Sequence, residues 1–267
     1  HVLSEDKYAR DLWSSHSKYM TVTDFPFVAA QTPQINNFLS NQKKLYSKIL
    51  KTGPLLFSNK SSIDSVKEIR ETLFPEHSEK KIILHAATPF LWKYFLPYVN
   101  LTADEYIKTI NDLIEEVDKI ENLYLVLRIR LKSFPGMKLE EIKSLFVESK
   151  SYEVRVDGNF SDFLLGCDLL TSFSSTVIEE ALQLERPVLQ YDPYNRYSHI
   201  KTSENADKHK QISTFYYTKS RKDLGRDLSW ILENHLIDKT LNSTLNWESY
   251  ILKPEKEWMK KLVREIK

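Results

Sequence analysis

Glycine is scarce in this chain of 267 residues. It occurs five times, at positions 53, 136, 158, 166 and 225, whereas about 7% glycine is usual. No two glycines have the spacing of G-x-G-x-x-G or of G-x-x-x-x-G-K-[ST], so the sequence contains neither the dinucleotide-binding fingerprint nor the P-loop. A protein of this composition that binds phosphate groups must therefore use helix N-termini, hydroxyl groups and arginines.

Cysteine, net charge and long apolar runs are lacking as well. Cys167 is the single cysteine, which excludes an internal disulfide framework and a cysteine-based zinc site, and we expect no bound metal. The 38 Lys and Arg residues balance 37 Asp and Glu, which argues against a nucleic acid partner. No apolar run approaches the length of a membrane span, and the N-terminal region lacks the apolar core of a signal peptide. We therefore expect a cytoplasmic protein that contacts a membrane at most peripherally.

Short apolar runs alternate with segments of helical periodicity between residues 53 and 237. The runs predict buried strands at 81–86, 123–127, 152–156, 167–171 and 187–191, the last of which closes the series. The periodic segments predict helices at 62–74, 102–120, 139–147, 162–165 and 175–184. Continuous apolar strands interleaved with helices are typical of a parallel sheet covered on both faces. We therefore predict an α/β fold with a doubly wound, Rossmann-like parallel sheet.

Hydroxyl side chains follow the strand predicted at 167–171, where the next helix begins. They are Ser172, Ser174, Ser175 and Thr176. Because such sheets bind ligands at the carboxyl ends of their strands, hydroxyls and free backbone N–H groups at this place suit a phosphate or a diphosphate. The alternative is that the two serines Ser174 and Ser175 only cap the helix.

Two adjacent acids, Glu179 and Glu180, follow on the same helix. A carboxylate at this place can accept hydrogen bonds from both hydroxyls of a ribose. Since adjacent helix positions are about 100° apart, only one of the two acids can face the ligand fully, and the residues do not select between them. The alternative is that both acids face solvent.

The ends of two other predicted strands carry further candidates. His85 follows an apolar run, where a buried structural imidazole is the alternative to a catalytic group. Arg128 and Arg130 alternate at the end of the strand at 123–127, so we expect at least one of them to face a ligand or an acidic partner. A structural salt bridge is the alternative for these arginines.

Residues 159–191 resemble the C-terminal nucleotide-binding half of GT-B glycosyltransferases. They look most like enzymes of bacterial surface-polysaccharide assembly, namely the CDP-glycerol glycerophosphotransferases of teichoic acid synthesis and the sugar transferases of capsule and O-antigen. Those families hold the donor nucleotide with an acid, a serine pair, a glutamate and a Pro-Val pair in this order. The matching residues here are Asp168, Ser174, Ser175, Glu179, Pro187 and Val188. Other GT-B families place the acid directly before alanine, which selects Glu180.

Two shorter segments support the same resemblance. Residues 83–90 are similar to the strand and loop that open the C-terminal domain in the teichoic acid group, and this similarity adds Thr88 as a donor contact. Residues 127–130 are similar to that group's [KR]-x-H-P strand end, with Arg130 in place of the usual histidine and no proline after it. The resemblance implies that Arg128 neutralises charge on the departing phosphate. It leaves the catalytic base unassigned.

The resemblance implies the GT-B fold and a glycosyltransferase activity. Such an enzyme moves a sugar or a glycerol-phosphate unit from a nucleotide-activated donor onto a glycan or glycolipid acceptor, as in capsule or lipopolysaccharide synthesis, at the cytoplasmic face of the inner membrane. The donor is a substrate and no cofactor is tightly bound; the families' own donors favour a CMP or CDP linkage over a UDP linkage. Two alternatives stay open, a nucleotide-sugar epimerase of GT-B fold and a non-catalytic GT-B-like scaffold domain.

On this interpretation the chain divides into three parts. Residues 1–52 are the remnant of an N-terminal, acceptor-side domain, an incomplete second domain with an apolar segment at 25–30 and a helix at 35–49. Residues 53–221 are the donor nucleotide-binding domain, and residues 222–267 are C-terminal helices. An aromatic stretch follows Pro193, for which packing is the first interpretation and base stacking the alternative; its tyrosines are Tyr194, Tyr197, Tyr216 and Tyr217.

Overall fold

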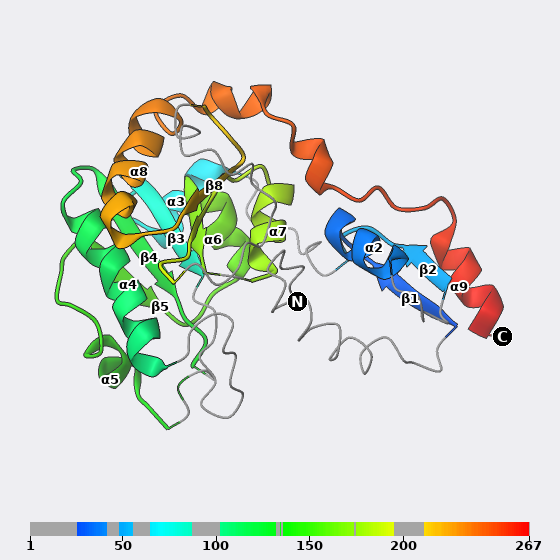
Figure 1. The fold of residues 1–267 in the computed structure, drawn as a ribbon, viewed down its shortest axis with the longest axis horizontal. Helices are drawn as coiled ribbons and strands as arrows, with labels where there is room; N and C mark the ends of the chain where they lie inside the picture. Colours follow the sequence, from blue (N-terminus) through cyan, green and yellow to red (C-terminus); the bar gives the residue numbers. More distant parts are fainter. Residues whose placement is uncertain are drawn as a thin grey trace.

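The computed structural model describes residues 26–41, 48–55, 65–86, 102–131, 136–173, 175–194 and 211–266, together with Phe134. These residues form a parallel sheet of six strands and a separate parallel pair of strands (Figure 1). The pair is drawn in blue, to one side of the larger sheet, and the last helix of the chain, in red, lies next to it.

The larger sheet contains β3 (Lys81–Ala86), β4 (Leu123–Arg128), β5 (Tyr152–Arg155), β6 (Leu169–Ser172), β7 (Val188–Tyr191) and β8 (Phe215–Thr218). All neighbouring strands are parallel, and their order is β5-β4-β3-β6-β7-β8. This is the strand order of the Rossmann fold, in which the direction of the crossovers reverses between two central strands, here β3 and β6. The predicted doubly wound parallel sheet is confirmed.

Helices cover both faces of this sheet in two layers (Figure 1). The first layer consists of α4 (Ala103–Asp118), α5 (Leu139–Lys143) and α8 (Arg221–Asn234). The second layer consists of α3 (Val66–Leu73), α6 (Phe160–Gly166) and α7 (Val177–Gln183).

Consecutive residues of the central strands face opposite layers. On β3, Ile83 belongs to the core cluster under α4 and α8, whereas Ile82 and Leu84 belong to the cluster under α6 and α7. Side chains alternate across a strand, so a strand covered on both faces must be apolar at successive positions. This requirement is the physical reason for the unbroken apolar runs in the sequence.

The predicted end of the strand series at Tyr191 is wrong, because β8 continues the sheet beyond β7. The aromatic side chains of β8 pack in the molecule: Tyr216 is buried, with its hydroxyl 2.8 Å from Nδ1 of His235. The hydroxyl of Tyr217 donates a hydrogen bond to Asp192 at 2.7 Å. The packing interpretation is thus confirmed for these two tyrosines, and Tyr197 lies outside the described residues.

The smaller unit is a βαβ unit of β1 (Phe27–Ala30), α2 (Pro33–Ser40) and β2 (Lys48–Lys51), with β1 and β2 paired in parallel. The helix predicted at 35–49 is therefore wrong at its far end, because Ile49 lies in a strand. Ile49 pairs with Val28, and this long-range pairing overrides the apparent helical spacing of the apolar residues.

The C-terminal residues return to the βαβ unit. The 3₁₀ helices η3 (Lys239–Thr244) and η4 (Trp247–Tyr250) lead from α8 past α7, where Trp247 is buried in the core. The chain then reaches β2, where the backbone nitrogen of Glu255 donates a hydrogen bond to the carbonyl oxygen of Lys51 at 2.8 Å. It ends in α9 (Trp258–Ile266), which lies beside β2 in Figure 1.

The division at residues 52 and 221 remains a prediction. The side chains of α8 belong to the core of the larger sheet, where Leu224, Leu228 and Ile231 are buried. Among the described helices, none combines the length and the apolar character that crossing a membrane requires.

Candidate functional site

The ends of β3 and β6 lie side by side at the carboxyl edge of the larger sheet. Ser172, the last residue of β6, is fully buried, and its Oγ donates a hydrogen bond to the carbonyl oxygen of Ala86, 3.4 Å away. From the preceding residues of both strands, Nδ1 of His85 lies 3.0 Å from Oγ1 of Thr171. The hydroxyl-rich segment therefore leaves the sheet at the point where the crossovers reverse, which is where sheets of this type bind ligands.

Ser175 and Thr176 directly precede α7, which begins at Val177 with Thr176 as its N-cap residue. The side chain of Thr176 makes no capping hydrogen bond. Oγ of Ser175 is 3.5 Å from the backbone nitrogen of Val177, which is too long for a strong hydrogen bond. Neither hydroxyl is strongly engaged in capping the helix. Two further predicted contacts lie outside the described residues: Thr88 and Ser174.

Both acids of α7 are buried, with 3% of Glu179 and 9% of Glu180 exposed, so neither faces solvent. The helix starts two residues later than predicted, which places both acids in its first turn. Oε1 of Glu180 accepts a hydrogen bond from Oγ of Ser161 at 3.3 Å. Burial raises the pKa of Glu180, while the bond from Ser161 and the positive charge of Arg130 act against the rise. Glu180 is thus linked to α6 directly and to Arg130 electrostatically.

Ser161 is a residue that sequence reasoning missed. It lies in the first turn of α6, where its backbone nitrogen donates a hydrogen bond to Oδ1 of the N-cap residue Asn159 at 3.2 Å. An asparagine ahead of an apolar run is a helix-start signal, so the sequence could place α6. It could not place Glu180 beside Ser161, because that contact depends on how α6 and α7 pack.

The two arginines after β4 have different surroundings. The guanidinium of Arg128 lies 5.6 Å from the ring centre of Phe163. It donates hydrogen bonds of 3.2 to 3.3 Å to three backbone carbonyl groups, those of Ile129, Arg155 and Gly158. Arg130 is exposed and forms no hydrogen bond or ion pair within the described residues. Arg128 therefore fastens the end of β4 to β5 and to the residues that follow β5. Arg130 is the arginine left available to a ligand.

His85 is fully buried on β3, and burial lowers its pKa to about 3. The imidazole is therefore neutral near pH 7, and within the described residues Nε2 has no hydrogen-bond partner. A catalytic base must reach the proton that it removes. The enclosed ring of His85 agrees with the structural interpretation rather than with a catalytic group.

Asp168, the first acid of the family-like motif, lies at the opposite edge of the sheet. It directly precedes β6, and its Oδ2 accepts hydrogen bonds from Nη1 of Arg70 and from the backbone nitrogen of Ile82, both at 2.8 Å. The side chains of Arg70 and Asp168 are 11% and 5% exposed. This acid joins α3, β3 and β6, and it is remote from a ligand at the carboxyl edge.

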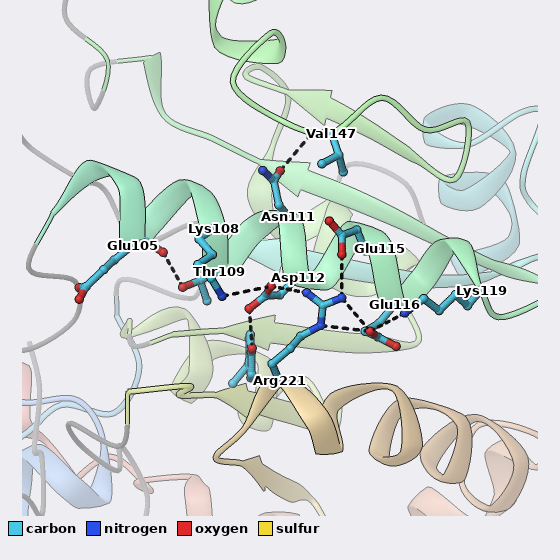
Figure 2. A network of polar contacts seen from close by, with 11 residues as sticks. Glu105, Lys108, Thr109, Asn111, Asp112, Glu115, Glu116, Lys119, Val147 and Arg221 are labelled. Carbon is cyan, nitrogen blue, oxygen red and sulfur yellow. Dashed lines mark hydrogen bonds and ion pairs between the residues drawn. The ribbon is translucent and has the colours of Figure 1, made fainter.

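A second polar cluster lies between α4 and α8, in the other helix layer (Figure 2). Arg221 of α8 contacts three acids of α4, which are Asp112, Glu115 and Glu116. Asp112 also accepts a hydrogen bond from the hydroxyl of Tyr191 at 2.8 Å. An open hollow of about 440 Å³ lies over this cluster, but the mutual pairing of its charges identifies it as a packing contact. Within the described part of the chain, no group of His, Cys, Asp or Glu side chains is arranged to hold a metal ion.

No family model and no curated protein matches the chain. Solved structures do match. The complex of S. aureus MnaA with UDP aligns with 98% of this chain and 64% of its own, at a TM-score of 0.60 and 14% identity. A structure described as a UDP-N-acetylglucosamine 2-epimerase from Listeria monocytogenes aligns with 98% and 63%, at a TM-score of 0.58 and 16% identity. The wall teichoic acid polymerase TagF aligns with 98% and 62%, at a TM-score of 0.50 and 14% identity.

The chain has the GT-B fold. The expectation from the sequence is confirmed at this level, and the GT-B enzymes that match the chain belong to bacterial surface-polysaccharide synthesis. At these identities the match shows the fold alone. The chain spans 62% to 64% of the length of the three structures. The larger sheet has the strand order of a Rossmann-like domain, and the assignment of the βαβ unit to the acceptor-side domain stays a proposal.

Proposed function

We propose that this GT-B chain is the donor-binding half of a glycosyltransferase, which moves a sugar or a glycerol-phosphate unit from a nucleotide-activated donor onto a bacterial surface polysaccharide. The observation that carries the proposal is the cluster of Glu180, Ser161 and Arg130. It lies next to the start of α7, where Ser175 and Thr176 present hydroxyl groups that do not cap the helix strongly. The acid and the hydroxyls at the starts of α6 and α7, and the cation after β4, thus all belong to the carboxyl edge of a Rossmann-like sheet, where such sheets bind ligands.

Each group suits one part of a nucleoside diphosphate. The hydroxyls of Ser175 and Thr176 can donate hydrogen bonds to phosphate oxygens, and bonds to charged groups are the stronger ones. The guanidinium of Arg130 can stabilise the charge that develops on the departing phosphate. The carboxylate of Glu180 can accept hydrogen bonds from the two hydroxyls of a ribose, and Ser161 holds that carboxylate in place.

The proposal takes a position on two alternatives that the sequence left open. Glu180 is assigned to the ribose because it is linked to Ser161 and Arg130, whereas Glu179 is rotated about 100° away on the same helix. Arg130 takes the phosphate role in place of Arg128, because three carbonyl groups already hold the guanidinium of Arg128. Ser172 is buried against Ala86 and supports the loop. The catalytic base stays unassigned.

The nucleotide in the proposal is a cytidine nucleotide. The resemblance of residues 159–191 to CDP-glycerol transferases supports it, and the competing uridine nucleotide is the one bound in the similar MnaA structure. The acceptor in the proposal is a glycan or glycolipid presented at the cytoplasmic face of the inner membrane.

A thermal-shift comparison of CMP, CDP, UDP and GDP tests the proposal. A ligand at about 100 times its Kd stabilises the folded state by about 2.7 kcal/mol, so we expect CDP or CMP to raise the Tm of the protein. Glu180→Gln should reduce the rise, and Glu140→Gln, whose side chain is 80% exposed in α5, should leave it unchanged. No rise with any nucleotide would support the scaffold alternative. A rise with UDP alone, together with epimerisation of UDP-N-acetylglucosamine, would support the epimerase alternative.

A further inference from the structure

The imidazole of His85 contacts two residues at the end of β6. Its Nδ1 is 3.0 Å from Oγ1 of Thr171, and its ring centre is 4.7 Å from the ring centre of Phe173, with the planes tilted by 55°. Residues two positions apart on an extended chain project to the same side. One side chain of β3 therefore holds two side chains of the neighbouring strand end from the same face of the sheet.

Ser172 lies between these two residues and projects to the opposite face. There its hydroxyl bonds to the carbonyl oxygen of Ala86, on the side of the sheet that α6 and α7 cover. The chain that follows leads through Ser175 and Thr176 to α7. The end of β6 is thus fixed by one contact on each side of the sheet.

Burying a polar side chain at position 85 is unfavourable for the stability of the fold, unlike burying the apolar side chains next to it. His85 is fully buried, and within the described residues its Nε2 has no hydrogen-bond partner. A buried polar atom without a partner destabilises the folded state, and an aliphatic side chain such as Ile83 or Leu84 has no such atom. What the imidazole provides in return is a hydrogen bond between Nδ1 and Oγ1 of Thr171.

We propose that His85 is a positioning residue of the nucleotide site, which acts through Thr171 and Phe173 on Ser175 and Thr176. The hydrogen bond to Thr171 and the packing on Phe173 fix the end of β6. They thereby aim the hydroxyls of Ser175 and Thr176 at the ligand. The inference rests on the proposed function, because it concerns the same site. His85 itself touches no ligand in this account.

Four variants separate positioning from packing. In His85→Asn the side-chain amide reaches the place of Nδ1, so the bond to Thr171 is kept. In His85→Gln the amide reaches the place of Nε2, and the bond is lost. His85→Leu keeps an apolar side chain without the bond. Thr171→Val removes the hydroxyl and preserves the shape of the side chain.

The first readout needs no ligand. Hydrogen exchange of the amides at 172–177, followed by mass spectrometry, should become faster by about fivefold in His85→Gln, His85→Leu and Thr171→Val, since a neutral hydrogen bond contributes about 1 kcal/mol. His85→Asn should exchange like the wild type. Equal exchange in Thr171→Val and wild type, or equal loss in His85→Asn and His85→Leu, would overturn the proposal.

The second readout is a titration with CDP. Affinity should fall about fivefold in His85→Leu and in Thr171→Val, and no further when the two changes are combined, because both remove one interaction. Additive losses would overturn the coupling through Thr171. If the wild type binds no nucleotide, the proposed function fails, and the exchange measurement still decides whether His85 positions the segment. If His85→Leu does not fold, Thr171→Val and His85→Asn carry the test.

Discussion

Ser161 and Glu180 are joined by a hydrogen bond from Oγ to Oε1, 3.3 Å long, although 19 positions separate them in the chain. The bond connects the first turn of α6 to the first turn of α7 at the carboxyl edge of the sheet. It holds one oxygen of the Glu180 carboxylate next to the start of α6. The two adjacent acids of α7, equivalent in the sequence, are therefore distinct in the folded protein.

The raised pKa of Glu180 predicts a pH-dependent effect on stability. Burial raises the pKa in the folded state above the ordinary value for glutamate, so the folded state binds the proton more tightly than the unfolded state does. Stability from this group is therefore full below the ordinary pKa of about 4.3 and is lost as the pH rises through the raised value. Glu180→Gln should have a Tm equal to or above that of the wild type at pH 7.

The control for this prediction is the same comparison at low pH. Near pH 4 the carboxyl group is largely protonated in the folded wild type, so the advantage of Glu180→Gln should shrink there. Thermal unfolding followed by circular dichroism between pH 4 and pH 8 measures both quantities. A Tm difference that grows as the pH falls would contradict the assignment of the raised pKa to Glu180.

Thr176→Val should weaken nucleotide binding with little effect on stability. Its hydroxyl makes no capping hydrogen bond, and a hydrogen bond to a charged phosphate is worth about 1.5–3 kcal/mol, so CDP affinity should fall about tenfold or more. The matched control is Thr102→Val, whose hydroxyl caps α4 by accepting a hydrogen bond from the backbone nitrogen of Glu105 at 3.2 Å. That variant should lose about 1 kcal/mol of stability and keep its affinity. The reverse pattern would show that Thr176 serves α7 and not the ligand.

Asp168→Ala should destabilise the domain strongly. The carboxylate is bonded to Arg70 and to the backbone nitrogen of Ile82, and removing one partner of a buried ion pair costs about 3–5 kcal/mol. The comparison variant is Glu140→Ala, whose exposed pair with Lys143 should contribute at most about 1 kcal/mol. Urea unfolding of both variants measures the difference. Similar losses of unfolding free energy in the two variants would mean that Asp168 does not join α3 and β3 to the start of β6.

Gly53→Ala should weaken the contact between the turn after β2 and the C-terminal residues Leu252 and Pro254. Gly53 has a φ of +69°, and a Cβ atom there would lie 2.9 Å from Cγ of Pro254 and 3.0 Å from the carbonyl oxygen of Leu252. Gly136 has a φ of +84° with nothing within 4 Å of the added atom, so Gly136→Ala measures the backbone strain alone, about 1–2 kcal/mol. Denaturant unfolding should show a larger loss for Gly53→Ala. Equal losses of stability in the two variants would show that Leu252 and Pro254 are not in close contact with Gly53.

The sheet was predictable where both of its faces are covered. Every residue of β4 from Leu123 to Leu127 is apolar and buried, so the run alone locates the strand to within one residue. β8 was missed because its four residues, Phe-Tyr-Tyr-Thr, stand in a polar stretch and resemble surface aromatics. Only the pairing with β7, which joins Val188 to Phe215, identifies this segment as a strand.

The site was predictable in part, for a related reason. Parallel topology brings the ends of all strands to one edge, so hydroxyls after β6 and arginines after β4 could be placed there from the sequence. The contacts of individual side chains at this edge could not be predicted from the sequence. That Arg128 is held by three carbonyl groups, and that Ser161 reaches Glu180, depends on how the loops and helices pack.

The most direct test of nucleotide binding at this edge is a calorimetric titration of CDP into the wild type, Glu179→Gln and Glu180→Gln. We predict saturable binding to the wild type and a loss of about tenfold in affinity for Glu180→Gln, equivalent to about 1.4 kcal/mol, with little change for Glu179→Gln. No saturable binding to the wild type, or equal and negligible effects of the two substitutions, would contradict the assignment of this edge of the sheet to a nucleotide donor.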